Sequence, residues 1–299
     1  MTTPRRVVGV DFGAAGRSAG EKTWIAVCRR TDDGLAVERL ATATETLGVD
    51  GTDRETVLPA LVEFLADPPA PTVAGLDFPF SLPAEFLGFG GDPDDSDDEP
   101  NSPEGLWRSF LADTPERWGV LGAVDDPKAL YETARETADE RGFPRTRAAD
   151  DDYGGQEPAG YRIRTQTFYG IAAVLAPLVD GGARVPPIAP APDADLTLLE
   201  TYPAAVFDAL DAVREGYKPD TRAGVAARRD NRASLRAAGV AVDGVAADCL
   251  TATDDALDAV AAAHAAAADY TPAVEGSYTP RERVEGVIFD GDRSLPEGR

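Results

Sequence analysis

The chain has 299 residues, of which 43% are hydrophobic, so it is long enough for one large domain or two small ones with a full core. Its 29 basic and 53 acidic residues give a formal net charge of −24. No apolar run approaches the roughly 20 residues that a membrane span needs, which excludes a membrane-spanning protein. The N-terminus leads directly into a predicted strand rather than an apolar signal core, so we expect a cytoplasmic protein.

The charged residues are strongly biased toward aspartate and arginine. Aspartate outnumbers glutamate 34 to 19, and only three of the 29 basic residues are lysines. This bias, together with abundant alanine, is typical of proteins from halophiles that accumulate salt. In molar salt the Debye length is only about 3 Å, so the negative charge does not exclude nucleic acid as a partner.

The first part of the chain is rich in strands. Runs of β-branched residues that end in short turns predict strands at 5–12, 23–28, 34–44 and 72–78. Short connections between the first three predict that they are antiparallel. A helical pattern over 53–65 precedes the fourth strand, which should therefore join by a crossover and make the sheet mixed.

Residues 88–160 have the composition of an insertion with acidic loops. Residues 88–105 contain almost no core-forming side chains and predict a mobile loop, and a second acidic loop is expected from Asp150 to Gly155. The remaining predicted elements are helices at 106–112, 128–141, 165–175, 203–214, 219–238 and 253–269 and strands at 196–201 and 283–289. With no repeat and no linker, we expect a single α/β domain over residues 1–299.

Acidic residues interrupt apolar strands at three places. Asp11 follows VVGV, Asp77 follows TVAGL and Glu200 follows LTLL. A carboxylate there is costly unless it is paired, hydrogen-bonded or bound to a metal. Ligands of open α/β sheets gather at the carboxyl ends of parallel strands, so these three acids are expected to converge if their strands are adjacent.

The predicted late helix supplies further acids. In TATDDALDAVAAAH, Asp254 and Asp258 lie four residues apart along the edge of the core stripe. Oxygen ligands without a Cys/His cluster favour a hard cation, Mg²⁺ or Mn²⁺. Two such ions about 4 Å apart activate a water and stabilise the leaving oxygen of a phosphodiester. This chemistry needs no catalytic histidine, and the chain has only one histidine.

Six sequence blocks resemble a known family. VVGVDFGAA, GLDFPFSLP, RIRTQTFYGI, LLETYPAAVF, DDALDAVAAA and EGVIF are similar, in this order, to the blocks of the family catalogued as domain of unknown function 429. That family comprises predicted nucleases of the ribonuclease H-like superfamily, related to RuvC-type junction resolvases. The resemblance implies a mixed five-stranded sheet flanked by helices, with its first three strands antiparallel, and cleavage of DNA or RNA that depends on Mg²⁺ or Mn²⁺.

The resemblance also implies roles for individual residues. Asp11 would be the first-strand acid, Asp77 or Glu200 the acid of a neighbouring strand, and Asp258, with Asp255, the acid of the late helix. We therefore predict catalytic roles for Asp11, Asp77, Glu200 and Asp258, and metal ligands at Asp11, Asp77, Asp255 and Asp258. Glu200 departs from the ribonuclease H order because it follows a long insertion rather than lying on the first helix.

Each acid also has a simpler structural explanation. Asp11 and Asp77 could end their strands as turn formers, and Glu200 could cap the following helix. Asp255 lies in the first turn of its helix, where acids complement the helix dipole whatever the function. Asp258 lies deeper in that helix, where this explanation is weaker.

Two basic segments are candidate nucleic-acid contacts. Residues 214–236 hold seven basic and three acidic residues, and Arg222, Arg229 and Arg236 recur every seven positions, which places them on one helical stripe. The alternative is a solvated face paired with the protein's many carboxylates. The second group, Arg162, Arg164 and Gln166, lies in an acid-free stretch and is predicted to hold a substrate phosphate.

Two other functions remain open. VGVDFGAA also resembles the first phosphate loop of actin-like and sugar-kinase-like ATP-binding proteins. Those proteins need a second Asp-x-Gly strand turn, which Asp77-Phe-Pro does not provide, and a duplicated domain. The other alternative is a non-catalytic scaffold that retains the fold without the metal site.

Overall fold

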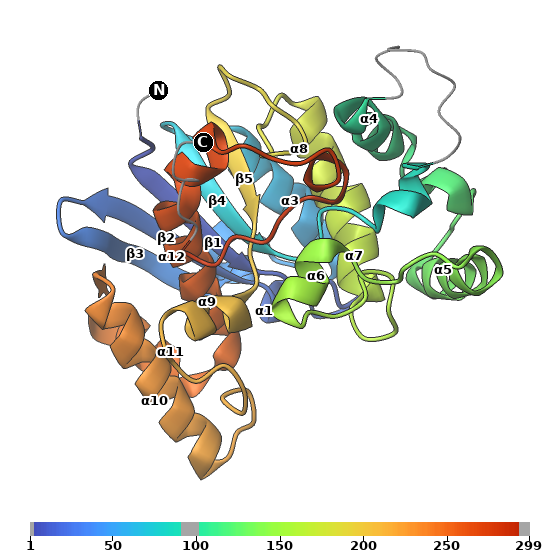
Figure 1. Ribbon diagram of the computed structural model, residues 1–299. Coiled ribbons are helices and arrows are strands. Elements are labelled where there is room, and N and C mark those ends of the chain that lie inside the picture. Colours follow the sequence, from blue (N-terminus) through green and yellow to red (C-terminus); the bar gives the residue numbers. More distant parts are fainter. Residues whose placement is uncertain (1–2, 91–101, 293–299) are drawn as a thin grey trace. The chain divides into compact units, whose positions relative to one another are not determined.

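The computed structural model describes residues 3–90 and 102–292, which form two compact units (Figure 1). The first unit comprises Met1–Asp77, Asp193–Gly276 and Phe289–Arg299, and the second comprises Phe78–Pro192 and Ser277–Ile288. The predicted insertion, residues 88–160, lies within the second unit. Residues 91–101, most of the predicted mobile loop at 88–105, lie outside the described residues.

The first unit has an α/β fold with a mixed six-stranded sheet in the order β5-β4-β1-β2-β3-β6. The strands are β1 (Arg6–Asp11), β2 (Trp24–Thr31), β3 (Gly34–Thr42), β4 (Thr72–Asp77), β5 (Leu196–Glu200) and β6 (Val240–Ala241). The first three strands are antiparallel, as predicted, while β4 lies parallel to β1 and β5 parallel to β4. The five strands implied by the family resemblance are one too few. The sixth strand, β6, is parallel to β3, and its two residues leave no periodicity to read.

Helix α12 (Asp254–Glu275) packs unusually close to the sheet because small residues line both sides. A Cβ atom added to Gly9 of β1 would lie 1.9 Å from the Ala259 carbonyl oxygen, and one added to Gly75 of β4 would lie 2.3 Å from that of Ala262. Real Cβ atoms never approach backbone so closely, so the strand and helix backbones are in direct contact. Fourteen of the helix's residues are buried, which identifies α12 as the central helix of the unit.

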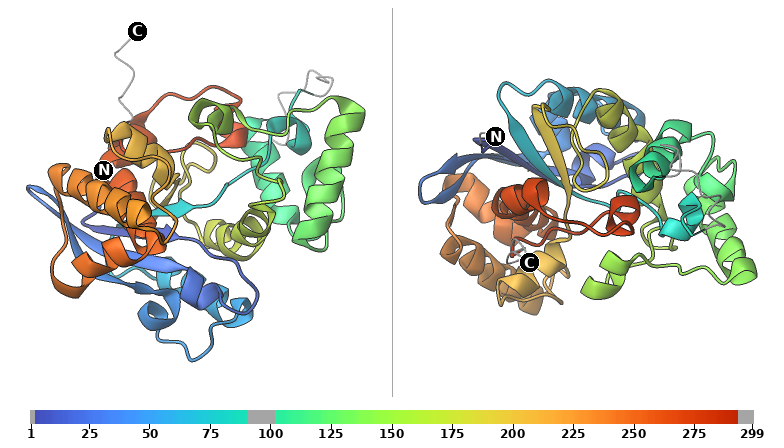
Figure 2. Two further views of the ribbon diagram at one scale, coloured as in Figure 1. Left: turned by 90° about the horizontal axis from the view of Figure 1, so that it is seen from below. Right: turned by 45° about the horizontal axis from the view of Figure 1, so that its top comes forward.

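The other helices of the first unit surround this sheet and α12. They are α1 (Ala19–Lys22), α2 (Ala43–Leu47), α3 (Arg54–Ala66), α9 (Pro203–Ala209), α10 (Arg222–Ala237) and α11 (Gly244–Ala252). Asp53 caps α3, and Pro203 opens α9 as predicted, although α9 ends at Ala209 rather than near residue 214. Helices α10 and α11 pack against each other beside β3 and β6 (Figure 2). Within the described residues, no helix combines the length and hydropathy that a membrane crossing requires.

The second unit is mostly helical. It contains η1 (Ala84–Leu87), α4 (Pro103–Asp113), η3 (Gly119–Leu121), α5 (Pro127–Arg141), α6 (Ala148–Tyr153), α7 (Arg164–Tyr169), the π-helical η4 (Gly170–Leu175), α8 (Ala176–Asp180) and α13 (Glu282–Glu285). The predicted helices at 106–112, 128–141 and 165–175 are confirmed. The π turn η4 begins at Gly170, where a Cβ atom would lie 2.4 Å from the Phe78 ring, so the helix can pass that ring only at a glycine.

Two predictions in this unit were wrong, and the partners of a buried carboxylate explain each of them. The expected acidic loop after residue 150 is helix α6, because Asp150 accepts from the Arg147 backbone N–H and pairs with the buried Arg147 guanidinium at 2.8 Å. The expected strand at 283–289 is largely replaced by α13. Its buried Glu285 accepts from the backbone N–H groups of Ala84 and Ala148 and pairs with Arg281 at 2.9 Å.

Candidate metal centre

The pairing of β1 with β4 brings two aspartates side by side. In this parallel pair Gly9 is the partner of Gly75, and Asp11 is the partner of Asp77. Side chains alternate between the two faces of a strand, so both aspartates lie on the face where the glycines meet α12. Both end their strands, at the carboxyl edge where ligands of α/β sheets gather.

The third carboxylate comes from α12. Asp258 precedes Ala259, the residue whose carbonyl lies against Gly9, and it is 1% exposed. Oxygen atoms of Asp11, Asp77 and Asp258 all lie within 4.8 Å of one another. We name these three residues the aspartate cluster. Within residues 3–90 and 102–292, no other group of His, Cys, Asp and Glu side chains meets this criterion.

Two neighbours of the aspartate cluster were missed by the sequence analysis. The Tyr217 hydroxyl donates to one carboxylate oxygen of Asp258 at 2.9 Å, and the Lys218 ammonium donates to the other at 2.8 Å. Tyr217 is buried, whereas the Lys218 side chain is 57% exposed. A signal was present, because Lys218 is one of only three lysines in a chain whose other basic residues are all arginine.

Helix α10 holds the segment that carries this pair. The Arg228 guanidinium, 1% exposed, donates to the backbone carbonyls of Tyr217 and Lys218 at 2.8 and 3.3 Å. Asn231, one turn further along, bonds both the N–H and the carbonyl of Val213. The inner face of α10 therefore fixes the backbone on which Tyr217 and Lys218 stand.

Burial and mutual repulsion raise the pKa values of the clustered carboxyls. Burial is the main cause for Asp11, with further contributions from the charges of Asp258 and Asp77, and its pKa lies well above the ordinary value. Burial raises the pKa of Asp77 to about 7, although Lys218 opposes the rise. The pKa of Asp258 is also raised, mainly by burial. The single positive charge of Lys218 therefore does not balance the negative charge of the three carboxylates.

Two other predicted site residues lie outside the aspartate cluster. Glu200 is paired with Leu76 rather than with Asp77, so alternation places it on the opposite face of the sheet. It is buried, and its charge contributes to the raised pKa of Asp77. Asp255 lies in the first turn of α12, 4.0 Å from the Lys22 ammonium, and acts on Asp11 only through its charge.

The predicted arginine stripe is present on α10. Arg222, Arg229 and Arg236 are all exposed, at the seven-residue spacing that places them on one side of the helix. The neighbouring Arg228 is not part of a solvated face, since it is buried and bonded to the segment that holds Tyr217.

The second predicted basic group belongs to the helical unit. Arg162 is exposed and precedes α7, while Arg164 and Gln166 are half-buried on its first turn. The Arg164 guanidinium lies over the ring of Tyr161, 4.1 Å from its centroid. This group belongs to the second unit, whereas the aspartate cluster belongs to the first.

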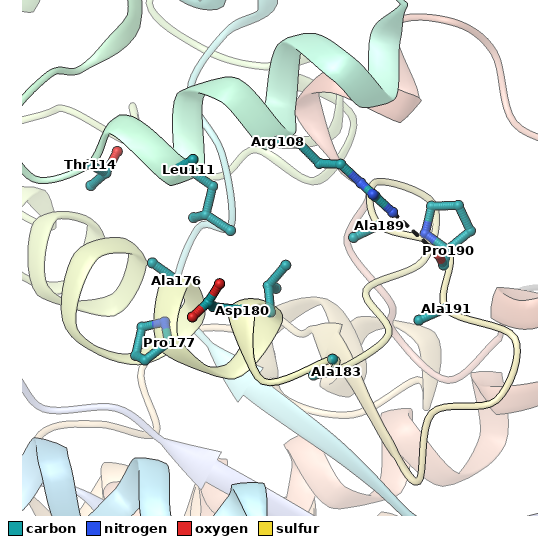
Figure 3. Close-up of a pocket in the computed structure, with 13 residues that line it drawn as sticks. Arg108, Leu111, Thr114, Ala176, Pro177, Asp180, Ala183, Ala189, Pro190 and Ala191 are labelled. Carbon is teal, nitrogen blue, oxygen red and sulfur yellow. Dashed lines mark hydrogen bonds between the residues drawn. The ribbon is translucent and has the colours of Figure 1, made fainter. Parts of the chain in front are cut away.

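A hollow of about 660 Å³ lies within the helical unit, between α4, α8 and residues 189–191. Figure 3 shows Arg108 reaching toward the Pro190 carbonyl on one side and Asp180 on α8. These are the only charged side chains that line it, among apolar residues such as Leu111. None of the predicted site residues lies in this hollow.

The fold and site together define an α/β protein with a mixed six-stranded sheet and a cluster of three aspartates, two of them buried, at its carboxyl edge. The model of a family described as "Protein of unknown function (DUF429)" matches residues 9–282, so the chain belongs to this family. No curated protein and no solved structure shows a significant match. The family assignment expected from the six sequence blocks is therefore confirmed.

Proposed function

We propose that the protein is a nuclease that hydrolyses phosphodiester bonds of nucleic acid with Mg²⁺ or Mn²⁺ held by Asp11, Asp77 and Asp258. The observation that carries the proposal is the convergence of these three carboxylates, from two adjacent strands and one helix, within 4.8 Å. The ribonuclease H-like and RuvC-like relationship belongs to the same proposal. It is supported by the three antiparallel first strands and by acids on the first strand, a neighbouring strand and the last long helix.

The donor set fits a hard divalent cation. All three side chains offer oxygen, which Mg²⁺ and Mn²⁺ prefer, and the cluster includes no sulfur or imidazole donor. Burial makes their negative charges costly in the free protein, as the raised pKa of Asp77, about 7, shows. A bound cation would relieve the repulsion that Lys218 relieves only in part.

When bound, such ions supply an activated water and stabilise the leaving oxygen of a phosphodiester. The protein's own side chains set the geometry. Tyr217 and Lys218 hold both oxygens of Asp258, which fixes the orientation of that carboxylate. The Lys218 side chain is 57% exposed, and we propose that it also contacts a substrate phosphate.

The single histidine takes no part in this proposal. His264 lies further along α12, where a Cβ atom on Gly291 would lie 3.5 Å from its Nε2 atom, and burial lowers its pKa. Arg222, Arg229 and Arg236, exposed on α10, are proposed to contact the phosphate backbone. We further propose an origin in a salt-accumulating halophile, on the strength of the net charge of −24 and the scarcity of lysine.

The test is Mn²⁺ binding by calorimetry in molar KCl, with a nuclease assay on mixed DNA and RNA substrates in the same buffer. We expect the wild type to bind Mn²⁺ and cleave, and Asp11→Asn to lose both. Asp255→Asn is the matched control, because it removes an equal charge nearby from outside the aspartate cluster, and it should retain both.

A folded wild type that binds no Mn²⁺ would refute the metal site. Binding without cleavage of any substrate would leave a metal-binding scaffold and overturn the nuclease assignment. An ATP titration then separates the remaining alternatives, since saturable ATP binding would favour the kinase-like interpretation.

A further inference from the structure

Two tyrosines and two arginines form a surface group in the helical unit. Tyr131 of α5 and Tyr161 meet edge to face, with ring centroids 6.0 Å apart. Arg164 lies over both rings, at 4.1 Å from the Tyr161 centroid and 5.6 Å from that of Tyr131, and Arg135 lies 5.7 Å from the Tyr131 centroid. We name these four residues the tyrosine–arginine cluster.

The most unusual member of this cluster is Tyr161. It is 70% exposed, and it is the only large hydrophobic side chain found exposed in the described part of the chain. Arg164 also donates to the Tyr161 backbone carbonyl at 2.6 Å, which ties the two residues together. Tyr161 is therefore an aromatic ring that is held in place by a cation while most of its surface faces water.

Basic side chains lie on both segments that carry the cluster. Lys128, Tyr131 and Arg135 are spaced three and four residues apart, so they share one side of α5. The chain from 158 to 179, which contains the exposed Arg162, has no acidic residue. Helix α5 also carries four acids, of which Glu132 pairs with Lys128, and Glu157 lines a small hollow beside Tyr131 and Arg135. The exposed Tyr161 ring with arginines beside it, rather than the local net charge, suits a ligand that has both phosphates and flat, apolar faces.

We propose that the tyrosine–arginine cluster binds an unpaired segment of nucleic acid, with a base stacked on Tyr161 and its phosphates contacted by Arg135, Arg162 and Arg164. The inference rests on the proposed nuclease function and specifies its substrate as single-stranded at this point. Every base has an aromatic face, and arginine binds both phosphates and aromatic faces, so this combination is typical of single-strand binding.

A double helix fits this surface less well. Its bases are stacked on one another and paired, so their faces are not available to an isolated exposed ring. A duplex could still contact the arginines through its phosphates, with no requirement for Tyr161. Dependence of binding on the Tyr161 ring is therefore the property that separates the two modes.

The experiment measures binding of a fluorescein-labelled 20-nucleotide oligothymidylate by anisotropy. The full-length protein is used in EDTA, so that neither cleavage nor the aspartate cluster contributes, over 0.1 to 1 M KCl. Tyr161→Ala should weaken binding about 5- to 160-fold, which corresponds to the loss of one base–aromatic stack. Tyr161→Phe retains the ring and should bind as the wild type does.

The arginines are tested through the salt dependence. Arg135→Gln should reduce the slope of log affinity against log salt concentration by about 0.7, the value for one phosphate contact on a single strand. Arg117→Gln is the matched control, since Arg117 is also exposed in this unit but belongs to no aromatic group in the described structure. Circular dichroism confirms that each variant is folded.

Three outcomes would overturn the proposal. The wild type does not bind the oligothymidylate, Tyr161→Ala binds it as tightly as the wild type does, or the wild type binds a 20-base-pair duplex of the same strand more tightly than the single strand. Displacement of the probe by polyglutamate as effectively as by unlabelled oligothymidylate would identify a general polyanion surface and would also overturn it. Failure here is distinguishable from failure of the nuclease proposal, because Mn²⁺ binding at Asp11 is measured without any oligonucleotide.

Discussion

Replacement of Asp77 by asparagine should stabilise the metal-free protein at neutral and alkaline pH. Asp77 is one of three carboxylates whose oxygens lie within 4.8 Å of one another. The nearby positive charge is the Lys218 ammonium, which pairs with Asp258. Asparagine has nearly the same shape, carries no charge and can donate a hydrogen bond to a neighbouring carboxylate. The substitution therefore removes repulsion without creating a cavity.

The magnitude follows from the pKa of Asp77, which folding raises from the ordinary value of 3.8 to about 7. Between these two pH values the folded state binds more protons than the unfolded chain, so the free energy of unfolding falls as pH rises. One pKa unit corresponds to about 1.4 kcal/mol, which gives about 4 kcal/mol lost above pH 7. Because Asp77 is only half-buried and shares the repulsion with Asp11 and Asp258, this value is an upper limit.

Urea unfolding in EDTA tests the prediction. At pH 8, Asp77→Asn should be more stable than the wild type by about 1 to 4 kcal/mol. At pH 5.5, part of the way through the titration, the gain should be smaller by up to about 2 kcal/mol. Asp50→Asn, in an exposed loop, is the control and should show neither effect. A variant less stable than the wild type at pH 8, or a gain that does not change with pH, would refute the reasoning.

Three other substitutions test the surroundings of the site. Lys218→Met should bind Mn²⁺ about tenfold more tightly by calorimetry, because the ammonium 2.8 Å from Asp258 competes with the cation. Lys128→Met is the exposed control. An unchanged Mn²⁺ affinity of Lys218→Met would contradict the competition. Tyr217→Phe removes the hydrogen bond from the Tyr217 hydroxyl to the buried Asp258 carboxylate. The free energy of unfolding at pH 8 should fall by about 1 to 3 kcal/mol. Urea unfolding identical to that of the wild type would contradict this prediction. Gly9→Ala should lower the free energy of unfolding by at least about 1 to 3 kcal/mol, because the new methyl group would lie 1.9 Å from the backbone of α12. The measurement is the Tm. A Tm equal to that of the wild type would show that the strand and helix can move apart without loss of stability.

The sequence was sufficient to predict the first five strands and their mixed arrangement. Those strands are continuous apolar runs that end in turn-forming residues, and the helix α3 between the third and fourth requires a crossover. It was not sufficient to fix the register between strands. Glu200 ends its strand as Asp11 and Asp77 do, but it stands one pairing position short of Asp77, and one residue changes the face of the sheet.

Contacts between distant parts of the chain were also beyond sequence analysis. Tyr217 and Lys218 lie in a short segment with no periodicity, about 40 residues before Asp258. Contacts with α10 and α12 hold them in place. The same holds for α13, whose short sequence predicts a strand until the partners of Glu285 are known. Local patterns identified the acids, whereas their partners depend on packing.

The direct contact between α12 and the two glycines limits the length of the side chains beside it. Strands β1 and β4 both carry the pattern Gly-x-Asp, as Gly9 to Asp11 and Gly75 to Asp77. In each strand the glycine contacts the backbone of α12, and the aspartate two residues later lies on the same face of the sheet. With the backbones this close, we expect the longer side chain of glutamate at Asp11, Asp77 or Asp258 to disturb the packing of α12 as well as the aspartate cluster.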